Sequence, residues 1–162
     1  MSRLPTRLPL SDPAGLIATA CGVGFLPAAP GTFGALIALP IAWGAYALLG
    51  SWAVAALGAL AFTAGVWAAG RYIQATGIED PSAVVIDEVA AQLFVLALAP
   101  PDLGFYVLGF VFFRIFDIAK PFPVSWADRR IKGGIGAMVD DLLAAIYAGA
   151  AMLITQWLLP GA

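Results

Sequence analysis

The sequence contains no histidine and a single cysteine, and only 11% of its 162 residues are charged. Without histidine the chain cannot use Ser-His or Cys-His catalysis, most zinc sites, or the chemistry of histidine phosphatases. The lone Cys21 is not followed by the arginine that the phosphate loop of a cysteine phosphatase requires. Any chemistry must therefore depend on carboxylates, lysine or arginine side chains and backbone donors, with or without a metal.

Apolar residues make up 62% of the chain, well above the roughly 45–50% of a soluble domain. They form five blocks, at residues 33–50, 52–70, 82–99, 103–118 and 139–159. A bilayer span needs about 20 helical residues, which the first, second and fifth blocks provide. The third and fourth are short and are joined by a helix-breaking Pro-Pro-Asp turn. We predict an all-α, polytopic membrane helical bundle of about four to five membrane helices, including a short hairpin around Pro100 and Pro101.

We expect a single integral membrane domain over residues 1–162. Residues 1–32 are predicted to form a cytoplasmic or interfacial arm with a candidate phosphate loop, and residues 33–159 the helical bundle. If every block crosses the membrane, the arm, residues 71–81 and residues 120–138 all lie on the same side. Every lysine and arginine of the chain then lies on this side or close to it. The positive-inside rule makes that side cytoplasmic.

Carboxylates cluster at three places, each near the predicted cytoplasmic end of a helix. They are Asp87 with Glu88, Asp117, and Asp140 with Asp141. Five acids at one membrane level repel one another, and a divalent cation such as Mg²⁺, which prefers oxygen ligands, relieves that repulsion. The alternative is that the acids cap helix N-termini. Capping fits Asp140 and Asp141 well and Asp87 and Glu88 in part, but not Asp117, which lies near a helix C-terminus.

Cations and glycines accompany these acids. Arg114, Asp117 and Lys120 follow at three-residue spacing, which suits either a helical ion pair or cations that offset phosphate charge. Gly31 and Thr32 precede the first apolar block, with Thr32 a candidate N-cap, and "KGGIGAM" (132–138) precedes the fifth. Free N–H groups at helix starts bind phosphate, although loop flexibility explains such glycines equally well.

Four stretches carry a resemblance to a known family. "LPAAPGT", "AVVIDE", "FFRIFDIAKPFPVSWADR" and "GGIGAMVDDLLAA" together resemble phosphatidylglycerophosphatase A, a bacterial membrane phosphatase, over about residues 22–145. The motifs keep the family's order and spacing. Ile86 and Phe122 stand where relatives often carry tryptophan.

The resemblance implies Mg²⁺-dependent hydrolysis of the terminal phosphomonoester of phosphatidylglycerophosphate, at the cytoplasmic face of the bacterial inner membrane. The residues expected to hold Mg²⁺ or activate water are Asp87, Glu88, Asp117, Asp140 and Asp141, with Lys120 as a further catalytic group. Those expected to bind the phosphate are Gly31, Thr32, Arg114, Lys120, Asp128, Arg129, Gly133 and Gly134. Asp128 is alternatively a solvated loop charge.

Several alternatives stay open at this point. The nucleophile is either an activated water or a carboxylate that forms an acyl-phosphate. Rival functions are a CDP-alcohol phosphotransferase, whose Asp-Gly-Ala-Arg signature is absent, and a transporter or accessory subunit, for which ionisable groups near the midplane are expected. We expect a phospholipid substrate and no nucleic-acid partner, and the sequence does not set the oligomeric state.

Overall fold

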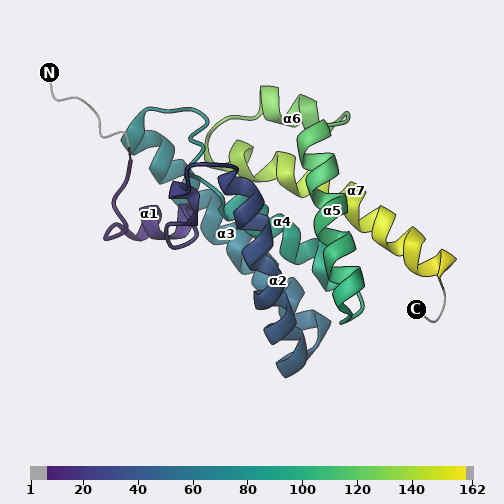
Figure 1. Cartoon of the computed structure of the whole chain (residues 1–162). Helices are drawn as coiled ribbons and strands as arrows, with labels where there is room; N and C mark the ends of the chain where they lie inside the picture. Colours follow the sequence, from purple (N-terminus) through teal and green to yellow (C-terminus); the bar gives the residue numbers. More distant parts are fainter. Residues whose placement is uncertain (1–6, 160–162) are drawn as a thin grey trace, which may run out of the picture.

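The computed structural model describes residues 7–159, and this part of the chain is helical without any strand. Seven α-helices and one short 3-10 helix follow one another along it (Figure 1). They are α1 (Pro13–Ala18), η1 (Val23–Phe25), α2 (Pro30–Leu49), α3 (Ser51–Thr76), α4 (Ile86–Ala97), α5 (Leu103–Ala119), α6 (Val124–Arg130) and α7 (Gly133–Leu158). The all-α prediction is confirmed.

Three helices are long and apolar enough to cross a membrane. α2 has 20 residues, and α3 and α7 have 26 each, which corresponds to about 30–39 Å at 1.5 Å per residue. Their outer surfaces expose large apolar side chains such as Trp43, Leu60 and Leu153. A surface of this kind is stable in lipid and unfavourable in water. These helices are therefore candidate membrane spans.

α4 and α5 form the predicted hairpin, with the turn where the sequence places it. The Asp102 carboxylate accepts hydrogen bonds from the N–H groups of Gly104 (2.8 Å) and Phe105 (3.2 Å), which caps α5. At 12 residues α4 is only about 18 Å long, too short to span the hydrocarbon core by itself. It packs against α2, α3, α5 and α7, and eight of its residues are buried. The bundle therefore holds the start of α4 in a fixed place.

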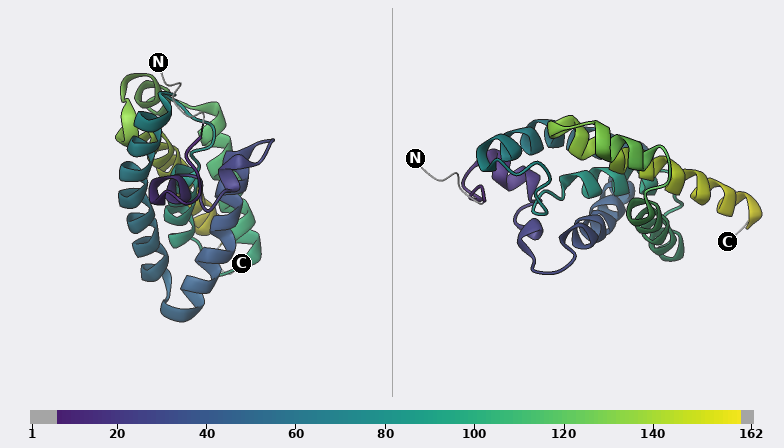
Figure 2. Two further views of the ribbon diagram at one scale, coloured as in Figure 1. Left: turned by 90° about the vertical axis from the view of Figure 1, so that its left-hand side faces the viewer. Right: turned by 90° about the horizontal axis from the view of Figure 1, so that it is seen from above.

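The N-terminal arm folds back against this bundle. Asp12 caps α1, and Ala14 and Ala18 are buried where α1 packs on α3. The Val85 N–H donates a hydrogen bond of 2.9 Å to the Ala18 carbonyl, which ties the arm to the start of α4. In Figure 2 the arm lies against one side of the bundle, and α7 extends past the other helices at the opposite side.

The start of α7 differs from the sequence prediction. The helix begins at Gly133 and includes residues that the hydropathy pattern assigned to a loop. Glycine has low helix propensity, but Gly134 is buried against the backbone of α3 at Val66 and Gly70. This close approach of two helices outweighs the propensity. α6 was not predicted, because it is short and follows two prolines.

Gly134→Ala is expected to destabilise the protein by about 1–3 kcal/mol, the usual cost of overpacking. An added Cβ would overlap the Val66 carbonyl oxygen and push α7 away from α3. Gly70→Ala at the same contact is the control, because its Cβ would meet Gly134 at an ordinary 3.7 Å. Thermal unfolding in detergent measures both variants. Equal stability of the two would show that this contact does not set the spacing of the helices.

Candidate functional site

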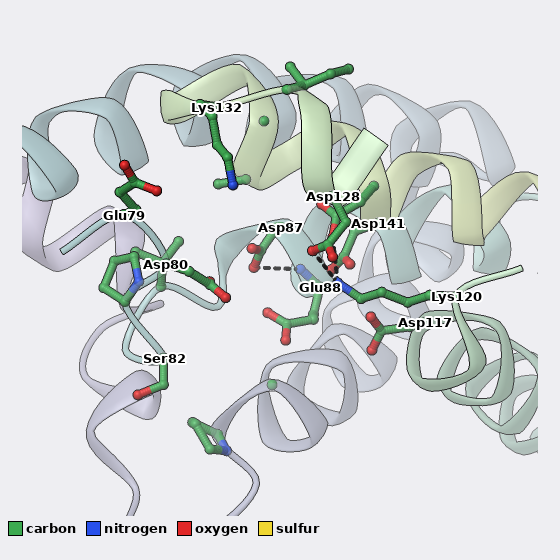
Figure 3. A pocket seen from close by; sticks show the side chains of 18 of the residues that line it. Glu79, Asp80, Ser82, Asp87, Glu88, Asp117, Lys120, Asp128, Lys132 and Asp141 are labelled. Carbon is green, nitrogen blue, oxygen red and sulfur yellow. Dashed lines mark hydrogen bonds and ion pairs between the residues drawn. The ribbon is translucent and has the colours of Figure 1, made fainter. Parts of the chain in front are cut away.

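A cavity of about 510 Å³ opens where the ends of several helices meet, away from the α2–α3 turn. The first turn of α2, the α3–α4 loop, the start of α4, the end of α5, α6 and the start of α7 surround it (Figures 1 and 3). Eight of the ten carboxylates of the chain line it, together with four cations. These are Glu79, Asp80, Asp87, Glu88, Asp117, Asp128, Asp140 and Asp141, with Arg114, Lys120, Arg129 and Lys132.

Three helix N-termini point at this cavity, those of α2, α4 and α7. None of them has a side chain at the N-cap position that hydrogen-bonds the first turn. Apart from the Glu88 N–H, which donates to Asp87 Oδ1, the N–H groups of these first turns have no side-chain partner among residues 7–159, and each terminus presents the positive end of its dipole. This positive potential offsets part of the repulsion among the acids and favours a bound anion.

Three of the acids form a compact cluster. One carboxylate oxygen from each of Asp87, Glu88 and Asp141 lies within 4.8 Å of the others. Glu88 Oε2 and Asp141 Oδ2 are buried without a hydrogen-bond partner among residues 7–159. Buried carboxylate oxygens that lack a donor are costly unless a cation compensates them. Hard oxygen donors at this spacing suit Mg²⁺, so the residues fit a divalent metal site.

Arg114 on α5 lies beside this cluster. Its Nη1 atom is 2.5 Å from Asp117 Oδ2 and 4.0 Å from Glu88 Oε1. All three side chains are mostly buried, so the arginine connects α5 to the start of α4. Arg114 thus pairs closely with Asp117 and places positive charge beside Glu88 in the cavity.

Lys120 joins two further acids. Its ammonium donates to Asp128 Oδ1 at 2.5 Å and to Asp140 Oδ2 at 3.0 Å, and so links the end of α5 to α6 and α7. Burial alone would lower the pKa of Lys120, but the hydrogen bonds to Asp128 and Asp140 outweigh it and raise the pKa above its ordinary value. The lysine therefore stays protonated and serves as a fixed positive charge.

Two cations that line the cavity, Arg129 and Lys132, make no ion pair within residues 7–159. Figure 3 shows the Lys132 ammonium directed into the cavity between Glu79 and Asp87. The sequence-based assignment missed Lys132, Glu79, Asp80 and Ser82 as site residues. The three in the α3–α4 loop lie in a polar stretch that resembles any solvated loop, and only the fold brings it over the cavity.

The predicted glycines and Thr32 lie in different environments. Thr32 lines the cavity, but it is not an N-cap, because α2 begins at Pro30 with Ala29 as the cap. Gly31 lies so close to Glu88 that a Cβ would overlap Oε1. Gly133 lines the cavity at φ 74°, a conformation that favours glycine. Gly134 packs on α3 instead, so its predicted contact with phosphate stays a prediction.

The position of Asp140 and Asp141 also differs from expectation. They lie about two turns inside α7, not at its N-terminus, so capping of that terminus does not explain them. Asp87 and Glu88 do lie in the first turn of α4, where Asp87 Oδ1 accepts a hydrogen bond of 2.9 Å from the Glu88 N–H. Asp117 lies near the C-terminus of α5, as predicted.

Gly31→Ala is expected to lower activity about tenfold, because the new methyl group would displace the Glu88 carboxylate from the cluster. Its stability should change little, since alanine is the better helix former. Gly44→Ala in the same helix is the control, because nothing lies within 4 Å of its added Cβ. Catalytic turnover and thermal unfolding are measured for both variants. Full activity of Gly31→Ala would mean that the position of Glu88 is not critical.

Comparison with known proteins identifies similar chains along almost the whole length. The model of the family described as phosphatidylglycerophosphatase A matches residues 16–156. A Bacteroides thetaiotaomicron protein named "Putative phosphatidylinositol-3-phosphatase" is 40% identical, over 96% of this chain and 98% of the relative. Proteins named phosphatidylglycerophosphatase A are 34% identical in Escherichia coli (88% of this chain, 83% of the relative) and 35% identical in Haemophilus influenzae (94% and 95%). No solved structure shows significant similarity to the chain.

Proposed function

The chain belongs to the phosphatidylglycerophosphatase A family of lipid phosphatases, and we propose that it hydrolyses the terminal phosphomonoester of phosphatidylglycerophosphate in a reaction that needs Mg²⁺. The products are phosphatidylglycerol and inorganic phosphate. The observation that carries this proposal is the cluster of Asp87, Glu88 and Asp141, two of whose buried oxygens have no hydrogen-bond partner in residues 7–159. The cavity around it also presents cations and helix N-termini.

Asp87, Glu88 and Asp141 would hold the metal, with Asp117 and Asp140 beside them as the other predicted members of the site. When bound, Mg²⁺ supplies positive charge that offsets the charge of the phosphate group. The N–H groups at the starts of α2 and α7 would donate to the phosphate oxygens. These donors are fixed by packed helices, so they need no rearrangement as charge develops.

The cations of the cavity fall into two groups in this proposal. Arg114 and Lys120 are held by acids and mainly position them. Arg129 and Lys132, which make no ion pair with any residue between 7 and 159, would approach the incoming phosphate, and Thr32, Gly31 and Gly133 line the same space. Asp128 anchors Lys120, which is a structural reason for its place in the site.

The bond to phosphorus is formed either by water or by a carboxylate oxygen. In the first case the water gives its proton to a carboxylate of the cluster, and the bond between phosphorus and the glycerol oxygen breaks. In the second case a carboxylate forms an acyl-phosphate, which water then hydrolyses. Both routes need the leaving glycerol oxygen to gain a proton, and both use the same cluster.

We place the cavity at the cytoplasmic face of a bacterial inner membrane, in a single integral membrane domain. Lys120, Arg129 and Lys132 line the cavity, and Arg130 lies beside it on α6, which the positive-inside rule favours at the cytoplasmic side. α2, α3 and α7 would cross the bilayer, and the α4–α5 hairpin would enter it from the same face as the cavity. In this arrangement the cavity lies at the level of the lipid headgroups, so a headgroup can enter it.

A second candidate substrate is a phosphatidylinositol 3-phosphate. The specific observation is the name of the Bacteroides relative, which aligns with nearly the whole chain. Both candidates present a phosphomonoester at the headgroup level, so the same cluster serves either. They differ in the group between this phosphate and the lipid.

Phosphate release in detergent tests the proposal. With Mg²⁺, the purified protein is expected to release phosphate from phosphatidylglycerophosphate faster than from phosphatidylinositol 3-phosphate, and EDTA should stop both reactions. Excess Mg²⁺ should restore them. Faster release from phosphatidylinositol 3-phosphate would show that the inositol lipid, and not phosphatidylglycerophosphate, is the preferred substrate. No release from either lipid, while an authentic phosphatase works in parallel, would contradict the proposed activity.

A further inference from the structure

A second cavity, of about 400 Å³, adjoins the first. It lies between the N-terminal arm and the α3–α4 loop, and its lining includes Arg7, Phe25 and Tyr72. Three residues line both cavities, namely Asp80, Pro81 and Ser82. The two spaces thus adjoin at a short piece of one loop, which lines both of them.

The second cavity offers hydrogen-bond donors to an anion. The Arg7 guanidinium lies 5.3 Å from the centre of the Phe25 ring, a cation–π contact that orients it. Arg7 forms no ion pair in the part of the chain that the structure describes. Tyr72 is fully buried, and its hydroxyl has no hydrogen-bond partner among these residues. A cation and a hydroxyl are therefore available, and Asp80 is the single carboxylate in the lining.

The walls of this cavity are fixed by close backbone contacts. Gly24 lies directly against Ala83, so that a Cβ on Gly24 would overlap the Ala83 carbonyl oxygen. The hydrogen bond from Val85 to Ala18 holds the next residues of the loop to the arm. These contacts hold the Phe25 side of the cavity against the shared loop, and the Arg7 guanidinium lies over the Phe25 ring.

We propose that the second cavity binds the internal phosphodiester of the lipid substrate, with Arg7 as its cationic partner and Tyr72 as a second donor. This inference rests on the proposed function, which places the terminal phosphomonoester in the first cavity. The substrate carries two phosphates joined by one polar linker, and the chain offers two adjoining cavities. The phosphodiester has one negative charge and is not cleaved, so one arginine without a metal cluster suits it.

Arg7→Gln tests the assignment through inhibition by the two reaction products, because each product carries only one of the two phosphate groups of the substrate. Phosphatidylglycerol retains only the phosphodiester, whereas inorganic phosphate represents only the phosphomonoester. We expect the variant to raise KM for phosphatidylglycerophosphate and the inhibition constant of phosphatidylglycerol about tenfold each, the effect of one lost charge-assisted hydrogen bond. The inhibition constant of phosphate and kcat should stay within about twofold. Arg7→Lys should recover part of the loss.

Arg130→Gln is the matched control, because Arg130 is exposed and lines neither cavity. It removes the same charge from the surface and should leave all four constants unchanged. If both variants changed the constants equally, Arg7 would only attract anionic lipid through its charge. That result would overturn the assignment. Unchanged phosphatidylglycerol inhibition in Arg7→Gln, or weaker inhibition by phosphate alone, would also overturn it. Failure of the wild-type protein to cleave phosphatidylglycerophosphate would instead contradict the proposed function.

Discussion

Asp141→Asn is expected to reduce turnover at least about a hundredfold while leaving the protein folded. Asp141 is buried, and one of its oxygens lies within 4.8 Å of an oxygen of Asp87 and of Glu88. Asparagine keeps the shape of the side chain but removes the charge that a divalent cation needs. Because the three carboxylates repel one another without a metal, the variant should be at least as stable as the wild-type protein in EDTA.

Two further measurements separate this explanation from misfolding. Mg²⁺ should raise the melting temperature of the wild-type protein, since a ligand that binds the native state stabilises it, and should leave that of Asp141→Asn unchanged. Asp102→Asn is the control, because Asp102 caps α5 outside the cavity and asparagine caps nearly as well. It should retain both activity and the Mg²⁺ response. Near-normal turnover of Asp141→Asn would remove Asp141 from the metal site.

Lys120→Met is expected to lower turnover at least about tenfold and the free energy of unfolding by about 1–2 kcal/mol. The variant leaves Asp128 and Asp140 without their shared cation. The stability loss is kept modest because about a third of the Lys120 and Asp128 side chains is exposed to solvent. Turnover should decrease more than stability, because Lys120 connects three helices that line the cavity.

Lys132→Met provides the comparison for stability, since Lys132 lines the same cavity without an ion pair in residues 7–159. Its unfolding free energy should change by less than about 0.5 kcal/mol. Adding Asp128→Asn to Lys120→Met should recover stability but not turnover, because the repulsion is removed while the link to α6 stays broken. Recovery of turnover in the double variant would show that Lys120 only neutralises Asp128.

The sequence was informative wherever a local rule fixes the structure. Hydropathy located the three long helices, and the Pro-Pro-Asp turn located the hairpin, because proline and a capping aspartate act on their own neighbours. The family resemblance is confirmed over residues 16–156. The meeting of Asp87, Glu88 and Asp141 followed from placing the acids at the same end of neighbouring helices.

Features set by contacts between distant residues were not predictable in this way. α7 begins at Gly133 because Gly134 packs on α3, which no local propensity indicates. Glu79 and Asp80 join the cavity because the fold brings the α3–α4 loop over it, and Lys132 joins it from the connection between α6 and α7. The ion pair of Lys120 with Asp140 joins the end of α5 to α7, and no local rule favours it over a pair of Lys120 with Asp117, three residues away.

Direct binding of a divalent cation is the sharpest test of the central claim that Asp87, Glu88 and Asp141 form a metal site. Mn²⁺ titrated into purified protein and followed by electron paramagnetic resonance should bind, and Mg²⁺ should displace it. Asp87→Asn and Asp141→Asn should each weaken binding at least about tenfold, whereas Asp102→Asn should not. Unchanged Mn²⁺ affinity in both cluster variants, or undiminished turnover of the wild-type protein in EDTA, would contradict the account.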